Sequence, residues 1–340
     1  MTGPPTERAP ELVLGDLGEQ EVIRRVVGRL AAPPTPAGPG DDAAIVPVPS
    51  AQVVATTDLL VQGVHFRFDW SSPTDVGAKA AVQNLADIAA MGARPTALLV
   101  GLAAPPELPV RVALGIADGL REACAAAGAA VVGGDLVRAD QVVLAVTALG
   151  DLDGRGPVLR SGARPGDVVV LAGAVGRSAA GLWLLRTGRV ASPEQEARWS
   201  GLLQAHRRPQ PPLRAGVELA RLRATAMCDV SDGLVVDAAT LATASGVAIE
   251  LDPAAAEQQA VDGQWCHVAT LPGSDPRGWV LGGGEDHALL ATVPAAAVTD
   301  AHEAGAVVIG RVLEAGAGLT PGAVVDLTGA PLAGGFDHFG

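Results

Sequence analysis

The sequence predicts a protein of two α/β domains. Its 340 residues favour two domains, and its 49% apolar content supplies enough material for buried cores. Short β-rich runs alternate with helical patterns in each half of the chain, which is typical of mixed α/β folds. Residues 151–166 concentrate Gly, Pro and Arg, so we place the domain junction there. We expect a flexible arm over 1–18, an N-terminal domain over 19–152 and a C-terminal domain over 153–340.

In the N-terminal half, the sequence predicts one helix before the β-rich runs and two helices between them. The first covers 18–30, and the second covers about 73–91, with Ser72 as its N-cap candidate, Pro at its first position and Asp in its first turn. The third covers about 109–127 and stops at Gly128, a suitable residue just past a helix end. The predicted strands cover 53–60, 97–103, 129–134 and 141–152.

One line of polar residues is expected on the helix over 73–91. Lys79, Gln83 and Asp87 recur at four-residue intervals, so they share one side of that helix. We expect Asp87 to lie beside Lys79 or a metal ion.

The C-terminal half restarts with a short apolar strand over 167–173 and a helix that ends before Gly188. A further helix covers about 214–223. The next helix would be capped by Ser231 or Asp232 and would stop at Gly246. The remaining predicted strands, joined by turns, cover 247–252, 279–286, 287–293 and 306–312.

Charge and cysteine content exclude several classes of function. A net charge of −13 argues against non-specific nucleic-acid binding, which depends on Lys and Arg. No apolar run approaches the roughly 20 residues that span a membrane, and the first residues lack a secretory signal pattern, so we expect a cytoplasmic protein without a membrane partner. Cys124, Cys228 and Cys266 are far apart, so we expect reduced core residues and no zinc site.

Six aspartates stand at strand ends or beside glycines, and together they suggest a magnesium site. Carboxylates combined with substrate phosphates are the usual ligands of Mg²⁺ in proteins. The chain has one lysine against 23 arginines and lacks a G-x-x-x-x-G-K-[ST] segment, so any ATP is bound without a P-loop. Each position has an ordinary explanation as a turn or helix cap, and the argument rests on the whole set. These aspartates are Asp42, Asp58, Asp87, Asp135, Asp229 and Asp232.

Other residues near these aspartates are candidate ligands or substrate contacts. Thr56 and Thr57 place hydroxyls at a strand end, and Gly134 would allow close approach of a phosphate or a metal. The imidazole of His65 would contact a phosphate, while Glu285 faces either the site or solvent. Arg160 would stabilise a polyphosphate.

Taken in order, eight segments resemble the thiamine-monophosphate kinases, part of a wider family that includes aminoimidazole ribonucleotide and selenophosphate synthetases. These segments are GDDAAIV, TTDLLVQGVHF, NLADIAAMGARP, GGDLVR, LRSGARPGD, VSDGL, GGGED and GFDHF, and the match runs from about residue 15 to 339. The resemblance implies a two-domain α/β fold of the PurM-like type. Its N-terminal mixed sheet would form a barrel across a homodimer, and its C-terminal domain would be an α/β sandwich.

The resemblance also implies direct in-line transfer of the γ-phosphate of ATP to thiamine monophosphate, giving thiamine diphosphate, assisted by several Mg²⁺ ions and without a covalent nucleophile. By motif, the implied metal ligands are Asp42, Thr56, Thr57, Asp58, Asp87, Asp135, Asp229 and Asp232. The implied ATP contacts are Gly134, Asp135, Arg160 and Ser231, and the implied thiamine monophosphate contacts are His65, Glu285 and Phe336.

The chain departs from the family pattern at His287 and Ala288, where an aromatic residue and Glu are more usual. Two alternatives stay open: a ligase similar to aminoimidazole ribonucleotide synthetase, and a nucleotide- or metal-binding module without turnover. A selenophosphate synthetase would carry a reactive Cys and a Lys within residues 1–50, which contain neither. A hydrogenase-maturation partner would end in Cys, whereas this chain ends in Gly340.

Overall fold

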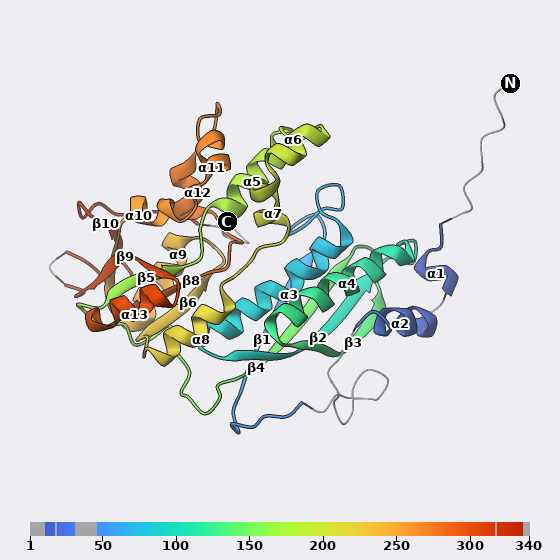
Figure 1. Cartoon of the computed structure of the whole chain (residues 1–340), viewed down its shortest axis with the longest axis horizontal. Helices are drawn as coiled ribbons and strands as arrows, with labels where there is room; N and C mark the ends of the chain where they lie inside the picture. Colours follow the sequence, from blue (N-terminus) through green and yellow to red (C-terminus); the bar gives the residue numbers. More distant parts are fainter. Residues whose placement is uncertain (1–10, 18, 31–45, 317, 336–340) are drawn as a thin grey trace.

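Two β-sheets, each with its own helices, lie side by side in the chain (Figure 1). The computed structural model describes residues 11–17, 19–30, 46–316 and 318–335. One sheet has four strands and the other has six, and both mix parallel with antiparallel pairs. The mixed α/β fold class is therefore confirmed.

The four-stranded sheet belongs to the N-terminal half and has the order β1-β4-β2-β3. Only β2 and β3 run parallel to each other. Helices α3 and α4 cover one face of this sheet, as Figure 1 shows. The elements of this half are α1 (Leu14–Leu17), α2 (Glu19–Val27), β1 (Val53–Val61), α3 (Pro73–Ala90), β2 (Arg94–Ala104), α4 (Val110–Ala127), β3 (Ala130–Arg138) and β4 (Val143–Asp151).

The start of α3 and the end of α4 follow the predicted signals. Ser72 caps α3, since its hydroxyl accepts the Asp75 N–H and the Asp75 carboxylate accepts the Ser72 N–H. Pro73 occupies the first helical position, where its missing N–H costs no hydrogen bond. Helix α4 ends at Gly128, whose φ of 71° is left-handed.

Helices α3 and α4 approach each other backbone to backbone through two glycines. A Cβ at Gly77 would lie 2.0 Å from the carbonyl oxygen of Ile116, and a Cβ at Gly119 would lie 2.0 Å from that of Thr74. No side chain fits at either position. This close contact fixes the position of α3 relative to α4. Helix α3 carries the line of polar residues, Lys79, Gln83 and Asp87, that faces the site.

Most of the other face of the four-stranded sheet is open among the described residues, although Val46 packs against Ala97, Ala130 and Val132 at one end. Side chains alternate along β1, so that Leu60 is buried beneath the helices while Leu59 is 56% exposed. Val53, Leu99 and Val137 are also exposed, and the pairing register puts them on the same face as Leu59. This row of apolar side chains is called the open face below.

The six-stranded sheet of the C-terminal half has the order β10-β7-β9-β5-β8-β6, in which only β10 and β7 are parallel. Its strands are β5 (Val168–Ala172), β6 (Ala226–Val230), β7 (Ala248–Leu251), β8 (Ala288–Val293), β9 (Ala306–Leu313) and β10 (Val324–Asp326). Its helices are α5 (Arg177–Arg186), α6 (Pro193–Arg198), α7 (Ser200–Arg207), α8 (Leu213–Arg221), α9 (Leu234–Ser245), α10 (Pro253–Gln258), α11 (Gly263–Val268), α12 (Pro276–Gly282) and α13 (Val298–Glu303), with a 3₁₀ turn, η1 (Ala295–Ala297), before the last.

The predicted strand over 279–286 is wrong. Trp279, Val280 and Leu281 belong to α12, because Asp275 caps this helix by accepting the Gly278 N–H and because Pro276 takes its first position. An apolar run of this length fits a buried helix as well as a strand, and the start signals decide between them.

The predicted N-cap of α9 is also wrong, whereas its predicted end at Gly246 is confirmed by a left-handed φ of 70°. Neither Ser231 nor Asp232 caps it, since the helix starts after Gly233 without a side-chain cap. Instead Asp237, inside the helix, accepts the N–H groups of Asp232 and Gly233 at 3.1 and 3.2 Å.

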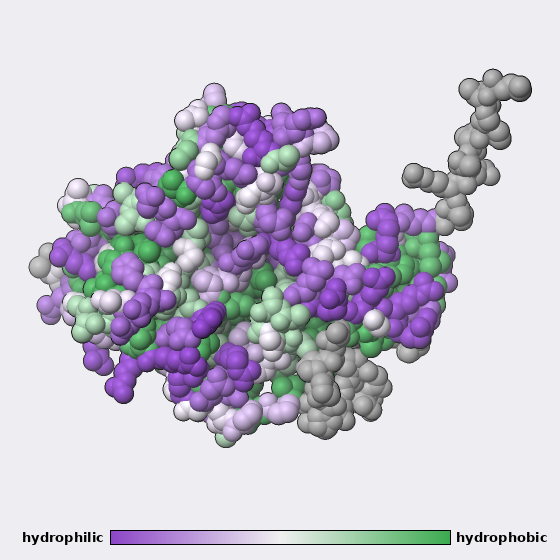
Figure 2. All heavy atoms as spheres, in the orientation of Figure 1, coloured by the Kyte–Doolittle hydropathy of each residue, from purple (hydrophilic) through white to green (hydrophobic). Residues whose placement is uncertain are grey.

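Of the three cysteines, Cys124 and Cys228 are buried as predicted, while Cys266 on α11 is exposed, which corrects the expectation of a core residue. No described helix is long and apolar enough to cross a membrane. The helices α5, α6 and α11 project from one end of the molecule, and their outer surface is largely hydrophilic (Figures 1 and 2).

Candidate functional site

Three aspartates from three separate elements lie together where the two halves of the chain meet. Asp58 is on β1, Asp87 on α3 and Asp229 on β6. Burial and the charges of Asp229 and Asp58 together raise the pKa of Asp87 to about 7. Burial likewise raises the pKa of Asp58, and the charge of Asp229 adds to this. The cluster therefore holds negative charges that repel one another.

The polar line on α3 faces this cluster and contributes to it. The Thr56 hydroxyl donates to Asp87 Oδ2 at 2.7 Å, and the Gln83 side chain forms a hydrogen bond with Asp58. Asn84 accepts the backbone N–H of Asp58 at 3.0 Å, so the edge strand β1 is held against α3. The sequence did not point to Gln83 or Asn84 as site residues. Its four-residue spacing did place Gln83 on the same side of the helix as Lys79 and Asp87.

Asp229 is held by His287, the residue at which the chain departs from the family pattern. His287 Nδ1 lies 3.1 Å from Asp229 Oδ2, and both side chains are buried. Burial alone would lower the pKa of His287, but its hydrogen bond with Asp229 and the charge of that carboxylate raise the pKa above its usual value. The hydrogen bond and the charge of Asp229 therefore favour the protonated form of His287 at one end of the aspartate cluster.

The turn before β8 brings Glu285 to the same junction. Glu285 and His287 both have positive φ, 66° and 55°, an uncommon backbone for residues with a side chain. Backbone hydrogen bonds fix this turn, because Ser231 and Val230 accept the N–H groups of Glu285 and His287 at 2.8 and 3.0 Å. The segment after β6 and the turn before β8 are therefore one unit, which places Ser231 beside Glu285.

Lys79 on α3 forms an ion pair with Glu285, with Nζ 2.9 Å from Oε1. Burial would raise the pKa of Glu285, but the charge and hydrogen bond of Lys79, together with His206 and His287, lower the pKa. On the other side of Glu285, the Nδ1 of His206 lies 3.4 Å from Oε2 and 3.2 Å from the Ser178 hydroxyl. Burial and the charge of Lys79 lower the pKa of His206 to about 3, so its imidazole is neutral. Lys79 thus points to Glu285, and Asp87 receives its hydrogen bond from Thr56 instead.

His65 and Arg160 lie on segments that flank this junction. His65 Nδ1 accepts the Val61 N–H at 3.0 Å, which leaves the proton of a neutral ring on Nε2. The segment that contains Arg160 runs along β6, because the carbonyl of Leu159 accepts the Met227 N–H at 3.0 Å.

Asp135 and Gly134 lie away from the cluster of their own chain. They are on β3, at the opposite edge of the sheet from β1, about 14 Å away for three strand spacings. The register aligns Asp135 with Gly101, Ala145 and Leu59, so its side chain shares the open face. A Cβ at Gly134 would lie 2.0 Å from the carbonyl oxygen of Val100, so packing within the sheet already requires glycine there.

Two predicted residues, Asp42 and Phe336, lie outside the described residues. Within the described residues, no three acidic, histidine or cysteine side chains already form a group that could hold a metal ion. The three aspartates of the cluster lie close together, but each forms a hydrogen bond with another side chain: Asp58 with Gln83, Asp87 with Thr56 and Asp229 with His287.

Asp286, next to Glu285, was not predicted and gives a testable pH dependence. Its carboxyl accepts the N–H groups of Gly176 and Ser178 at 2.6 and 2.8 Å, and burial raises its pKa from 3.8 to about 7. Between about pH 4 and 7 the folded state therefore keeps this proton on Asp286, whereas the unfolded state has released it. The free energy of unfolding should fall as the pH rises through this range.

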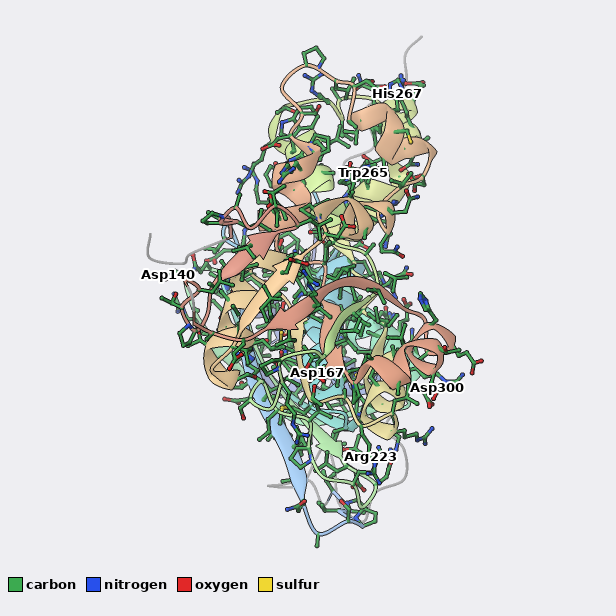
Figure 3. The ribbon with its side chains drawn as sticks, turned by 90° about the vertical axis from the view of Figure 1, so that its left-hand side faces the viewer. Asp140, Asp167, Arg223, Trp265, His267 and Asp300 are labelled. Carbon is green, nitrogen blue, oxygen red and sulfur yellow. The ribbon has the colours of Figure 1, made fainter. Side chains whose placement is uncertain are left out.

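The measurement is urea unfolding at several pH values for the wild type and Asp286→Asn. The variant should be less stable at low pH by about 1–3 kcal/mol, because one N–H loses its acceptor, and it should lose less stability as the pH rises. Asp300→Asn is the control, since Asp300 is exposed at the periphery (Figure 3). Equal pH slopes in all three proteins would contradict the assignment.

Comparison with known proteins agrees with this architecture. Residues 40–152 match the AIR synthase related protein N-terminal domain, and residues 164–319 match the corresponding C-terminal domain. The chain therefore belongs to the AIR synthase related proteins. Solved structures of the hydrogenase maturation protein HypE share the fold, with a TM-score of 0.73 at 19% identity over 90% of this chain and 94% of that one.

Within these proteins, the chain is a member of the thiamine-monophosphate kinase family. It is 50% identical to the thiamine-monophosphate kinase of Mycobacterium tuberculosis H37Rv over 82% of this chain and 81% of that protein. It is 43% identical to the Corynebacterium glutamicum kinase over 82% of each. The structure of AaThiL complexed with AMPPCP and TMP has a TM-score of 0.75 and 33% identity, over 88% of this chain and 91% of that chain. The predicted family is confirmed.

Proposed function

We propose that this chain transfers the γ-phosphate of ATP to thiamine monophosphate, forming thiamine diphosphate and ADP. The observation that carries the proposal is the aspartate cluster of Asp58, Asp87 and Asp229 beside Glu285. The acceptor is itself a phosphate and is already anionic, so the transfer needs alignment and charge neutralisation more than a base. The family relatives named as kinases of this substrate support the same reaction.

The residues fit several Mg²⁺ ions. Mg²⁺ takes one or two carboxylates and completes its octahedron with water and substrate phosphate, so it needs no group of three protein ligands. Carboxylates that raise each other's pKa are ready to accept a divalent cation. The bound ions would neutralise and align the two phosphate groups. The proposed ligands are Asp42, Thr56, Thr57, Asp58, Asp87, Asp135, Asp229 and Asp232.

The substrates are held by the chain's own groups on either side of the cluster. Glu285, kept negative beside Lys79, is suited to the positive charge of the thiazolium ring. The Nε2 proton of His65 is suited to a phosphate oxygen. We propose Phe336 as a stacking partner of the substrate, and the proposed ATP contacts are Gly134, Asp135, Arg160 and Ser231.

We further propose that the working form is a homodimer in which the open faces of two copies pack together. Leu59 and its apolar neighbours on that face supply the buried surface that such an interface requires. A barrel closed with β1 of one copy beside β3 of the other removes both sheet edges. Asp135 would then approach β1 of the partner chain, where Thr57 shares its face and Asp58 is the next residue, and this accounts for its distance from the cluster in its own chain.

The test is to measure thiamine diphosphate and ADP in parallel, with thiamine monophosphate, ATP and Mg²⁺ as reactants. Wild type should form both products in equal amounts, and Asp58→Asn should lose about 10²–10³-fold in turnover, as expected for removing one electrostatic contact. Asp300→Asn should keep full activity. ADP without thiamine diphosphate would favour a ligase of the aminoimidazole ribonucleotide synthetase kind, and ATP binding without any product would favour a non-catalytic module.

A further inference from the structure

The chain has a single lysine, and it is buried at the junction of the two halves. Lys79 is 2% exposed, in the middle of α3. Burying an ammonium group is costly unless its donors are satisfied. Two acceptors are in place: the Glu285 carboxylate at 2.9 Å and the backbone carbonyl of His65 at 3.2 Å. One side chain therefore joins the two residues assigned above to the substrate, one from each half of the chain.

The choice of lysine is informative because this chain otherwise uses arginine. Apart from Lys79, the 23 residues of the Lys and Arg type are all arginines. An ammonium group is compact and can donate in several directions, whereas the planar guanidinium of arginine suits side-on pairing with one carboxylate. The two acceptors of Lys79 belong to different segments, the loop after β1 and the turn before β8, so a compact donor fits between them.

Lys79 is also the direct cationic partner of Glu285 and the group that lowers its pKa most. The other neighbour of Glu285, His206, is buried and neutral and so supplies no full positive charge. Without Lys79 the carboxylate would lose its direct ion pair while the turn keeps it partly buried, since its side chain is 29% exposed. The orientation of the Glu285 side chain would then depend on its contact with His206.

We propose that Lys79 is a positioning residue for thiamine monophosphate, which sets Glu285 and the His65 loop in the orientation that binds this substrate. The inference rests on the proposed function and deepens it. Lys79 acts through Glu285 and His65 and not through the aspartate cluster, whose side chains form hydrogen bonds with Gln83, Thr56 and His287. Its removal should therefore weaken binding of thiamine monophosphate and leave binding of ATP nearly unchanged.

The experiment measures KM for each substrate in wild type, Lys79→Met and Lys79→Arg. Lys79→Met should raise KM for thiamine monophosphate about 10- to 100-fold while KM for ATP changes less than about threefold, and Lys79→Arg should recover part of the loss. Arg208→Met is the matched control, since Arg208 also forms an ion pair between the two halves, with Glu122 on α4 at 2.9 Å. It should change neither KM.

A double-mutant cycle keeps the test valid if Lys79→Met is unstable because it leaves Glu285 unpaired. Lys79→Met combined with Glu285→Gln removes both charges, and it should bind thiamine monophosphate about as weakly as Glu285→Gln alone. Additive losses, an unchanged KM for thiamine monophosphate in folded Lys79→Met, or equal changes in both KM values would overturn the inference. Wild type that forms no thiamine diphosphate would instead overturn the proposed function.

Discussion

Mixing Asp58→Asn chains with Asp135→Asn chains is expected to restore about a quarter of wild-type turnover, although each variant alone is nearly inactive. Asp58 and Asp135 lie at opposite edges of the four-stranded sheet, and the register puts them on opposite faces. If each site takes Asp58 from one copy and Asp135 from the other, a mixed dimer contains one site with both aspartates intact. Half of the dimers formed from equal mixtures are mixed, and each has one working site of two.

The chains are unfolded together, refolded and assayed for thiamine diphosphate. Dimers refolded from one variant alone give the baseline. A mixture of Asp58→Asn with Asp87→Asn is the control, because both residues belong to the cluster of one chain and no intact site can form. Activity no higher than the baseline in the Asp58 and Asp135 mixture would show that Asp135 serves its own chain or does not serve the site.

Gly119→Ala is expected to destabilise the protein by about 3 kcal/mol, the upper range for overpacking. Helix propensity alone predicts the opposite, since alanine favours a helix interior by about 1 kcal/mol over glycine. The steric term wins because the new Cβ would lie 2.0 Å from the Thr74 carbonyl oxygen, a backbone atom that moves only if α3 moves. Displacing α3 would also displace Lys79 and Asp87, so activity should fall together with stability.

Urea unfolding of Gly119→Ala and Gly263→Ala separates the two effects. Gly263 is also helical, at the start of α11, and no heavy atom lies within 4 Å of a Cβ added there. Gly263→Ala should therefore be neutral or slightly stabilising. A stabilised Gly119→Ala would mean that α3 and α4 are not in backbone contact.

The helices of the N-terminal half could be predicted closely because their ends carry local signals. The capping box at Ser72 and the left-handed Gly128 act within one turn of chain. The strand β6 was missed because five residues between a helix and a loop give too little pattern to detect. The N-cap of α9 was wrongly assigned because Asp237, one turn inside the helix, takes over the role of an N-cap side chain.

Many residues of the site could be inferred from residue type and order, but the contacts between residues far apart in the sequence could not. The sequence placed Asp58, Asp87 and Asp229 in one set of six candidate magnesium ligands, and the fold shows which three bring their charges together. His206 and Asp286 gave no signal, since a buried histidine and a buried aspartate become functional only through partners far along the chain. The position of Asp135 depends on strand order, which no local pattern specifies.

The burial of Lys79 also determines how this protein can be attached to other molecules. Reagents that acylate amines, such as activated esters, need an accessible amino group, and the folded chain offers no lysine side chain to them. Lysine-directed coupling to a dye, a bead or a sensor surface would therefore be slow while the protein stays folded. Unfolding exposes this one lysine side chain, so a label on Lys79 reports the loss of the native state.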